Sequence, residues 1–87
     1  MHTVEISYTA HALARMSERG VTRQQVETVL QSPLRVLRAE ANRVEVQGMI
    51  DRNGTPMLLR VIIDSGAVVT VVTVIATSKI SKYGASP

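Results

Sequence analysis

Residues 43–77 read RVEVQGMIDRNGTPMLLRVIIDSGAVVTVVTVIAT, and this stretch decides the fold class. It contains three apolar runs, rich in valine and isoleucine, separated by two short polar segments. The first segment, Asp51-Arg52-Asn53-Gly54, carries the Asn-Gly pair typical of a tight hairpin, and the second is Asp64-Ser65-Gly66. Because such short connections join neighbouring antiparallel strands, the stretch predicts three strands of a meander.

A fourth predicted strand precedes these three. Residues 34–39 predict a short strand, and residues 40–42 turn the chain into the strand at 43–50. The next two strands are predicted at 56–63 and 67–77. The predicted sheet is therefore a four-stranded antiparallel meander.

The first third of the chain has the pattern of two helices. Thr9 is a predicted N-cap for a helix over residues 10–19, and Gly20 supplies a left-handed stop. The second helix begins at a capping box, with Thr22 as the N-cap and Gln25 three residues later. The connection between the two helices, at Gly20 and Val21, is so short that it predicts a sharp turn of one helix against the other.

Together these elements predict one α+β domain, in which two N-terminal helices pack on one face of the four-stranded antiparallel sheet. Its parts are a lead segment at 1–9, a helical hairpin at 10–33, the sheet at 34–77 and a basic tail at 78–87. In the lead segment, apolar residues alternate at positions 4, 6 and 8, which indicates a further short strand.

One arginine stands in the middle of an apolar strand. Alternation along residues 56–63 places a purely apolar set toward the helices: Met57, Leu59, Val61 and Ile63. Arg60 is then predicted on the opposite, open face of the sheet. Two interpretations stay open: a structural arginine paired with Glu45 on the next strand, or an anion ligand at the centre of a concave sheet.

The predicted strand at 67–77 is apolar on both faces, and an exposed edge of this kind invites aggregation. We therefore expect it to be covered by the N-terminal segment, the tail, a second copy of the chain or a protein partner. A homodimer through residues 67–77 is one of these predictions.

Composition favours a small globular domain with acidic partners. Of the 87 residues, 45% are hydrophobic and 20% are charged, the net charge is +3, and the absence of cysteine excludes thiol chemistry and disulfides. A basic surplus favours nucleic acid or an acidic protein as partner, but two tyrosines are too few for a broad base-stacking platform. No apolar run approaches the about twenty residues of a membrane helix, so we expect a soluble cytoplasmic protein without a membrane partner.

Metal and cofactor chemistry find little support in the residue pattern. The two histidines are nine residues apart, and Asp51 and Asp64 stand in turns that favour aspartate for local reasons. The glycines are scattered and form no phosphate loop. We therefore expect no metal site and no cofactor.

A basic site without a metal remains, and RNA is the substrate class that suits it. RNA supplies its own nucleophile, the 2′-hydroxyl, so a protein needs only to position the strand, stabilise the charged phosphorane and move protons. The candidate catalytic residues are His11 for proton transfer and Arg19 and Arg60 for charge. Candidate RNA- or anion-binding residues are Arg15, Lys79, Lys82 and Tyr83. The alternative for His11 is an exposed residue near a helix cap, and for the arginines of its helix a solvated flank.

The segment 9–21, TAHALARMSERGV, resembles the opening signature T-x-H-A-x-x-R-M-x-x-R-G-[IV] of the domain of unknown function 4258 family of small bacterial proteins. Residues 26–33 are similar to the second helix and proline turn of that family. Residues 59–62 and 71–74 resemble two later strands of the family, and residues 79–83 resemble its usual ending. The resemblance covers nearly the whole chain.

The resemblance implies an α+β fold related to the RelE/BrnT-like toxins, a fold that supports metal-independent ribonucleases. It also implies a set of recurring polar positions, His11, Arg15, Arg19, Arg60, Thr73 and Lys79, and on this ground Thr73 is a further candidate RNA- or anion-binding residue. The link to toxins is an analogy at the level of fold.

Two functional hypotheses follow. The first is a metal-independent endoribonuclease of a toxin–antitoxin system, with RNA as substrate and an antitoxin protein as partner. The second is a non-catalytic protein-binding or oligomerisation module. Arg60 separates them, because a site residue should be open and unpaired, whereas a structural residue should be tied to Glu45.

Overall fold

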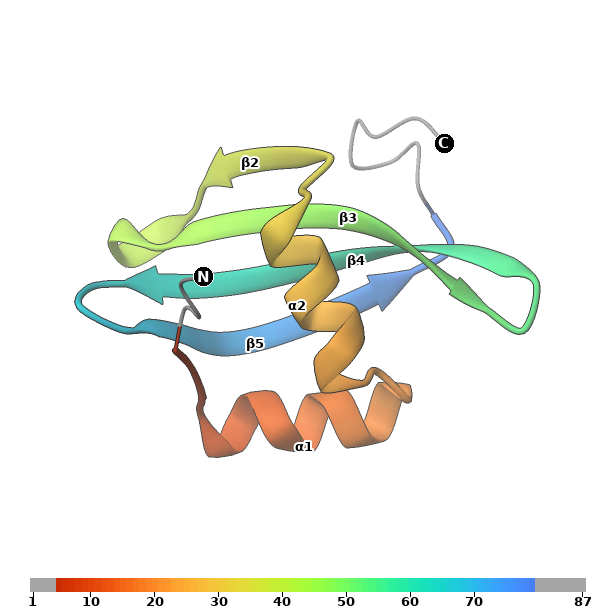
Figure 1. Ribbon diagram of the computed structural model, residues 1–87, viewed down its shortest axis with the longest axis horizontal. Coiled ribbons are helices and arrows are strands. Elements are labelled where there is room, and N and C mark those ends of the chain that lie inside the picture. The colour runs from red at the N-terminus through yellow and green to blue at the C-terminus, as the bar shows by residue number, and fades with distance from the viewer. Residues whose placement is uncertain (1–4, 80–87) are drawn as a thin grey trace.

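The computed structural model describes residues 5–79, which form a five-stranded mixed sheet with two helices against one face (Figure 1). The elements in chain order are β1 (Ile6–Tyr8), α1 (Ala10–Arg19), α2 (Arg23–Gln31), β2 (Arg35–Arg38), the short 3-10 helix η1 (Glu40–Asn42), β3 (Val44–Arg52), β4 (Thr55–Ser65) and β5 (Val69–Thr77). The α+β class is thus confirmed, and both helices have the predicted positions.

The strand order is β1-β5-β4-β3-β2. Strands β2 to β5 form the predicted antiparallel meander. The further short strand indicated in the lead segment is confirmed as β1. The prediction of a purely antiparallel four-stranded sheet is wrong, because β1 joins the sheet as a fifth strand that runs parallel to β5. Short connections reveal only pairs that are adjacent in sequence, and β1 is separated from its partner by nearly the whole chain.

The connection between β3 and β4 follows the expected turn chemistry. Asn53 and Gly54 adopt left-handed backbone angles, with φ of 50° and 86°, as a two-residue hairpin turn requires. The Gly54 amide donates a hydrogen bond to Oδ2 of Asp51 at 3.1 Å. This tight turn lets both strands extend further than predicted, to Arg52 and from Thr55.

Both helices begin at the predicted caps. The Thr9 hydroxyl accepts a hydrogen bond from the amide of Ala12 at 3.0 Å and donates to the carbonyl of Val72 at 2.9 Å, which attaches the start of α1 to β5. The amide of Gln25 donates to the Thr22 hydroxyl at 3.1 Å, and the Thr22 amide donates to Oε1 of Gln25 at 3.0 Å. The reciprocal pair is the predicted capping box.

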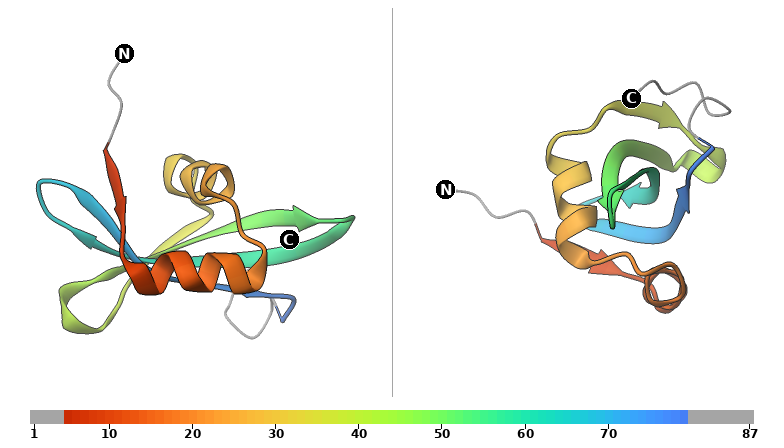
Figure 2. Two further views of the ribbon diagram at one scale, coloured as in Figure 1. Left: turned by 90° about the horizontal axis from the view of Figure 1, so that it is seen from below. Right: turned by 90° about the vertical axis from the view of Figure 1, so that its right-hand side faces the viewer.

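The core lies between the helices and the predicted apolar face of β4. Ala12 and Val26 from the helices are fully buried, as are Leu59 and Val61 of β4. Figure 2 shows that the sheet curls away from the helices, so that its second face is concave. The residues that alternate with the core residues, Arg60 among them, face this concave side.

The edge of the long C-terminal strand is partly covered. β1 pairs with Val69, Thr70 and Val71, so one of the predicted covers, the N-terminal segment, is confirmed there. Among residues 5–79, no helix is long and apolar enough to cross a membrane.

Candidate functional site

The centre of the concave face is an ion pair between neighbouring strands. Nε of Arg60 on β4 lies 2.7 Å from Oε2 of Glu45 on β3, and Nη2 of Arg60 lies 2.9 Å from Oε1. Both oxygens of the carboxylate are thus engaged in the forked geometry that a guanidinium favours. The side chains are 19% and 11% exposed. The structural interpretation of Arg60, a pair with Glu45, is the one the geometry shows.

A buried glutamine completes this cluster. Gln47 lies directly opposite Arg60 in the β3–β4 register and is 1% exposed. Its Nε2 donates to Oε2 of Glu45 at 2.6 Å, while its Oε1 is buried without a hydrogen-bond partner. The Glu45 carboxylate therefore accepts three hydrogen bonds from two side chains.

These contacts control the charge of Glu45. Hydrogen bonds from Arg60 lower the pKa of Glu45 most, burial opposes them, and Gln47 and the positive charges of Arg60 and Arg35 lower it further. The net direction is downward, so Glu45 is ionised at neutral pH. With Arg35 on the adjacent β2, the face holds two guanidinium groups and one carboxylate.

A lowered pKa makes part of the protein's stability dependent on pH. Because the folded pKa of Glu45 lies below its unfolded value, the contribution is complete at neutral pH and is lost as pH falls through the folded value. We expect the stability difference between the wild type and Glu45→Gln to shrink between about pH 7 and about pH 3. Urea unfolding at both pH values measures it, and a difference that stays constant would contradict the assignment.

The predicted α1 residues do not join this cluster. His11 and Arg19 are exposed, and Arg15 pairs with Glu18 on its own helix at 3.2 Å. No hydrogen bond or ion pair found within residues 5–79 links His11 or Arg19 to Arg60. The three predicted catalytic residues are therefore not brought together by direct contacts.

The predicted anion-binding residues are also dispersed. Thr73 lies opposite Ile62 in the β4–β5 register, on the concave side with Arg60. Lys79 is exposed beyond the end of β5. Lys82 and Tyr83 lie outside the described residues. Thr73 is thus the only one of these predicted residues that the described structure places on the same sheet face as the ion pair.

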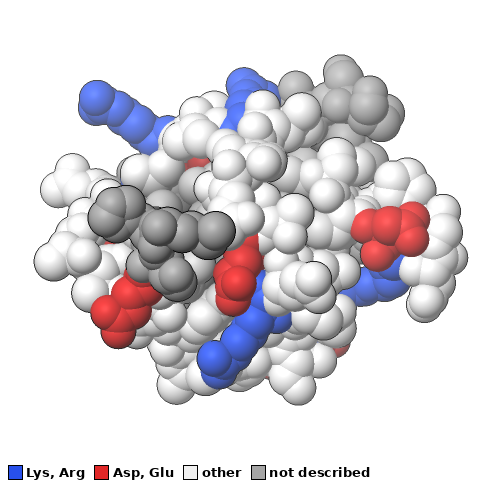
Figure 3. All heavy atoms as spheres, in the orientation of Figure 1, with Lys and Arg blue, Asp and Glu red and all other residues white. Residues whose placement is uncertain are grey.

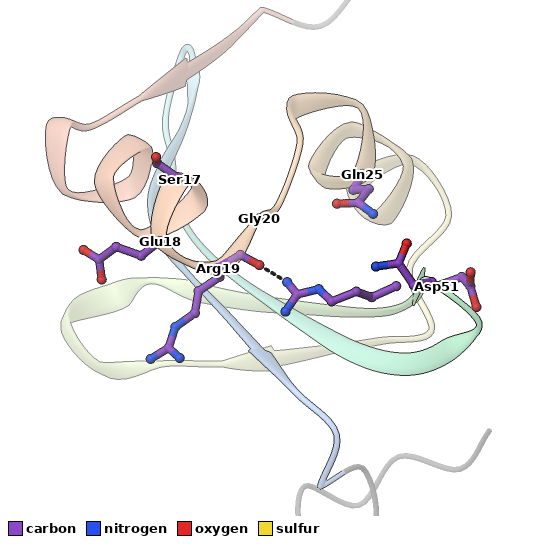
Figure 4. Close-up of a pocket in the computed structure, with 8 residues that line it drawn as sticks. Ser17, Glu18, Arg19, Gly20, Gln25 and Asp51 are labelled. Atoms are coloured by element: carbon purple, nitrogen blue, oxygen red, sulfur yellow. Dashed lines mark hydrogen bonds between the residues drawn. The ribbon is translucent and has the colours of Figure 1, made fainter.

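Arg19 borders a different feature, a cleft of about 530 Å³ between the helix joint and the β3–β4 hairpin (Figure 4). Its lining is polar and of mixed charge: Ser17, Glu18, Arg19, Gly20, Gln25, Asp51, Arg52 and Asn53. The Arg52 guanidinium donates to the backbone carbonyl of Arg19 and thereby attaches the hairpin to the end of α1. Two arginines offset two acidic residues here, so the cleft has no clear charge preference.

Sequence reasoning missed Gln47, Arg35 and Arg52 as members of these sites. Strand alternation carries a usable signal for Gln47, because it follows Glu45 by two residues and so lies on the same face of β3. Arg35 lies on this face too, since it is opposite Gln47 in the β2–β3 register. Arg52 had no such signal, since its contact with α1 depends on how the hairpin folds back. No group of three or more potential metal-ligating side chains occurs within residues 5–79.

Comparison with known proteins identifies one family. The model of a family described as a domain of unknown function, DUF4258, matches residues 8–82. No curated protein matches the chain, and no solved structure matches it.

Proposed function

The chain belongs to the domain of unknown function 4258 family, and since that description names no activity, we propose from the site that it is a non-catalytic protein-binding module. The observation that carries this proposal is the forked pair between Arg60 and Glu45. A guanidinium that stabilises a phosphorane must direct its donors toward the substrate. Two donors of Arg60 are instead directed at a carboxylate of the same sheet.

The dispersal of the other candidate groups supports the same proposal. A general acid or base must lie within hydrogen-bond reach of the reacting atoms, together with the group that stabilises charge. His11 is exposed on α1, whereas Arg60 is on the sheet face turned away from the helices. A binding module does not need these side chains to converge.

The test is an assay for the activity that the proposal denies. Purified full-length protein is incubated with total bacterial RNA in the presence of EDTA, and the protein is separately expressed in a bacterial host. We expect intact RNA and unimpaired growth. Cleavage in EDTA that is lost in His11→Ala would overturn the proposal, because His11 is exposed and its replacement should leave the fold intact.

A second candidate function is favoured by the charges of the concave face. Arg60 and Arg35 lie beside the ionised Glu45 on this face, and guanidinium groups can stabilise a charged phosphorane without a metal. This is the chemistry of a metal-independent endoribonuclease, in keeping with the RelE/BrnT-like fold that the family resemblance implies and with an antitoxin protein as partner. It predicts growth arrest and cleavage of RNA in EDTA, the reverse of the results expected above.

A further inference from the structure

The outer strand β2 and the residue just before it carry the two most exposed large apolar side chains of the described residues. Leu34 is 51% exposed and Val36 is 56% exposed. β2 is the last strand of the sheet, so within residues 5–79 no strand pairs with its outer side. An edge with unpaired backbone groups and exposed apolar side chains can accept one more strand.

The charge around this edge is positive. Arg35 and Arg38 lie at the two ends of β2, and Arg43 follows the turn that leads into β3. All three side chains are exposed, and Glu40 is the only acidic residue in that connection. Figure 3 shows basic side chains projecting along the upper margin of the molecule, over β2.

These observations indicate one kind of binding partner for the edge of β2. We propose that the edge of β2 binds an extended acidic segment of a partner protein by strand addition. The β2–β3 register puts Val36 and Arg38 on one face of the sheet, so the partner would present an apolar residue to Val36 and a carboxylate to Arg38 on that face. This inference rests on the proposed binding function and specifies its surface and its partner. Main-chain hydrogen bonds would supply affinity, and the alternating side chains would supply specificity.

A second copy of the chain fits the edge less well. Residues 34–38 contain no acidic side chain. A symmetric antiparallel pair of two copies centred on Val36 would place Arg38 opposite Leu34, so neither copy would offer a carboxylate to Arg38. A partner with glutamate or aspartate at that position forms an oppositely charged cross-strand pair with Arg38.

The test uses two blocked synthetic peptides of about seven residues, a length that spans β2 with its flanks. One peptide carries a glutamate two residues from a valine, so that in antiparallel pairing they face Arg38 and Val36, with threonine at the other positions; the other peptide has lysine in place of the glutamate. Each is titrated into the full-length protein while backbone amide NMR shifts are recorded. We expect the acidic peptide to shift the amides of residues 34–38 and the lysine peptide to leave them unchanged.

Two charge-reversal variants make the test specific. Arg38→Glu should weaken binding of the acidic peptide at least about tenfold and allow the lysine peptide to bind. Arg23→Glu is the matched control, because Arg23 is exposed in the first turn of α2, where it contacts the Tyr8 ring at 5.0 Å, at the end of the helix remote from β2. This control should bind the acidic peptide like the wild type.

Other outcomes overturn the inference. These are unchanged amides at residues 34–38, equal binding of both peptides, or concentration-dependent shifts of β2 without peptide, which would indicate self-pairing. Binding at another surface would also overturn it while leaving the proposed binding function in place. RNA cleavage in EDTA would count against the proposed function without bearing on the edge.

Discussion

Arg60→Ala is expected to lower the free energy of unfolding by about 3–5 kcal/mol, the usual cost of removing one partner of a buried ion pair. Among residues 5–79, the replacement leaves the Glu45 carboxylate, 11% exposed, with Gln47 as its single hydrogen-bond donor. Glu45 must then remain charged in a partly desolvated position or take up a proton. Urea unfolding at neutral pH measures the loss, and a change below about 1 kcal/mol would show that the pair contributes little to folding.

A double replacement separates a structural pair from a functional one. Arg60→Met combined with Glu45→Leu removes both charges and keeps apolar volume on the concave face. Because a buried pair contributes little beyond the desolvation that it offsets, the double variant should recover much of the stability lost in Arg60→Ala. Recovery remains partial because Nε2 of Gln47 loses its acceptor. A double variant less stable than Arg60→Ala would contradict this account.

The same pair distinguishes the two functional proposals. If the protein is a binding module that uses the edge of β2, the refolded double variant should still bind the acidic peptide. If it is a ribonuclease, the double variant should lose cleavage although its stability is restored. Stability and activity are thus measured on one protein, and neither result can be attributed to misfolding.

Local sequence signals predicted the elements well. The Thr22 and Gln25 pair, the Gly20 stop and the Asn53-Gly54 turn act within a few residues of chain, and all three are found as expected. Strand alternation also predicted which face of β4 packs against the helices. These features depend on backbone preferences and periodicity, which the sequence carries directly.

Long-range features were harder to predict. The parallel pairing of β1 with β5 joins residues more than sixty positions apart, such as Ile6 and Val69, and no short connection indicates it. For Arg60, alternation predicted the correct face, but its state depends on the register that brings Glu45 within reach. A sequence pattern can place a charge on a face, whereas a pairing register decides whether that charge is neutralised.

Gly48→Ala is expected to cost about 1–3 kcal/mol, because α2 crosses β3 at this glycine with no room for a methyl group. A Cβ at position 48 would lie 2.8 Å from Cγ2 and 3.0 Å from Cγ1 of Val29. Val29 is 2% exposed, and a β-branched side chain in a helix has one strongly preferred rotamer, so it cannot turn away. The helix must move off the sheet instead.

Two further variants define the cause of that loss. Val29→Ala in the Gly48→Ala background removes the two methyl groups that the new Cβ would meet, so the double variant should be more stable than the sum of the single changes predicts. Gly66→Ala is the control, since a Cβ there meets nothing within 4 Å, and its effect should stay within about 0.5 kcal/mol. Additive losses at positions 29 and 48 would mean that the helix does not approach the sheet closely at this point.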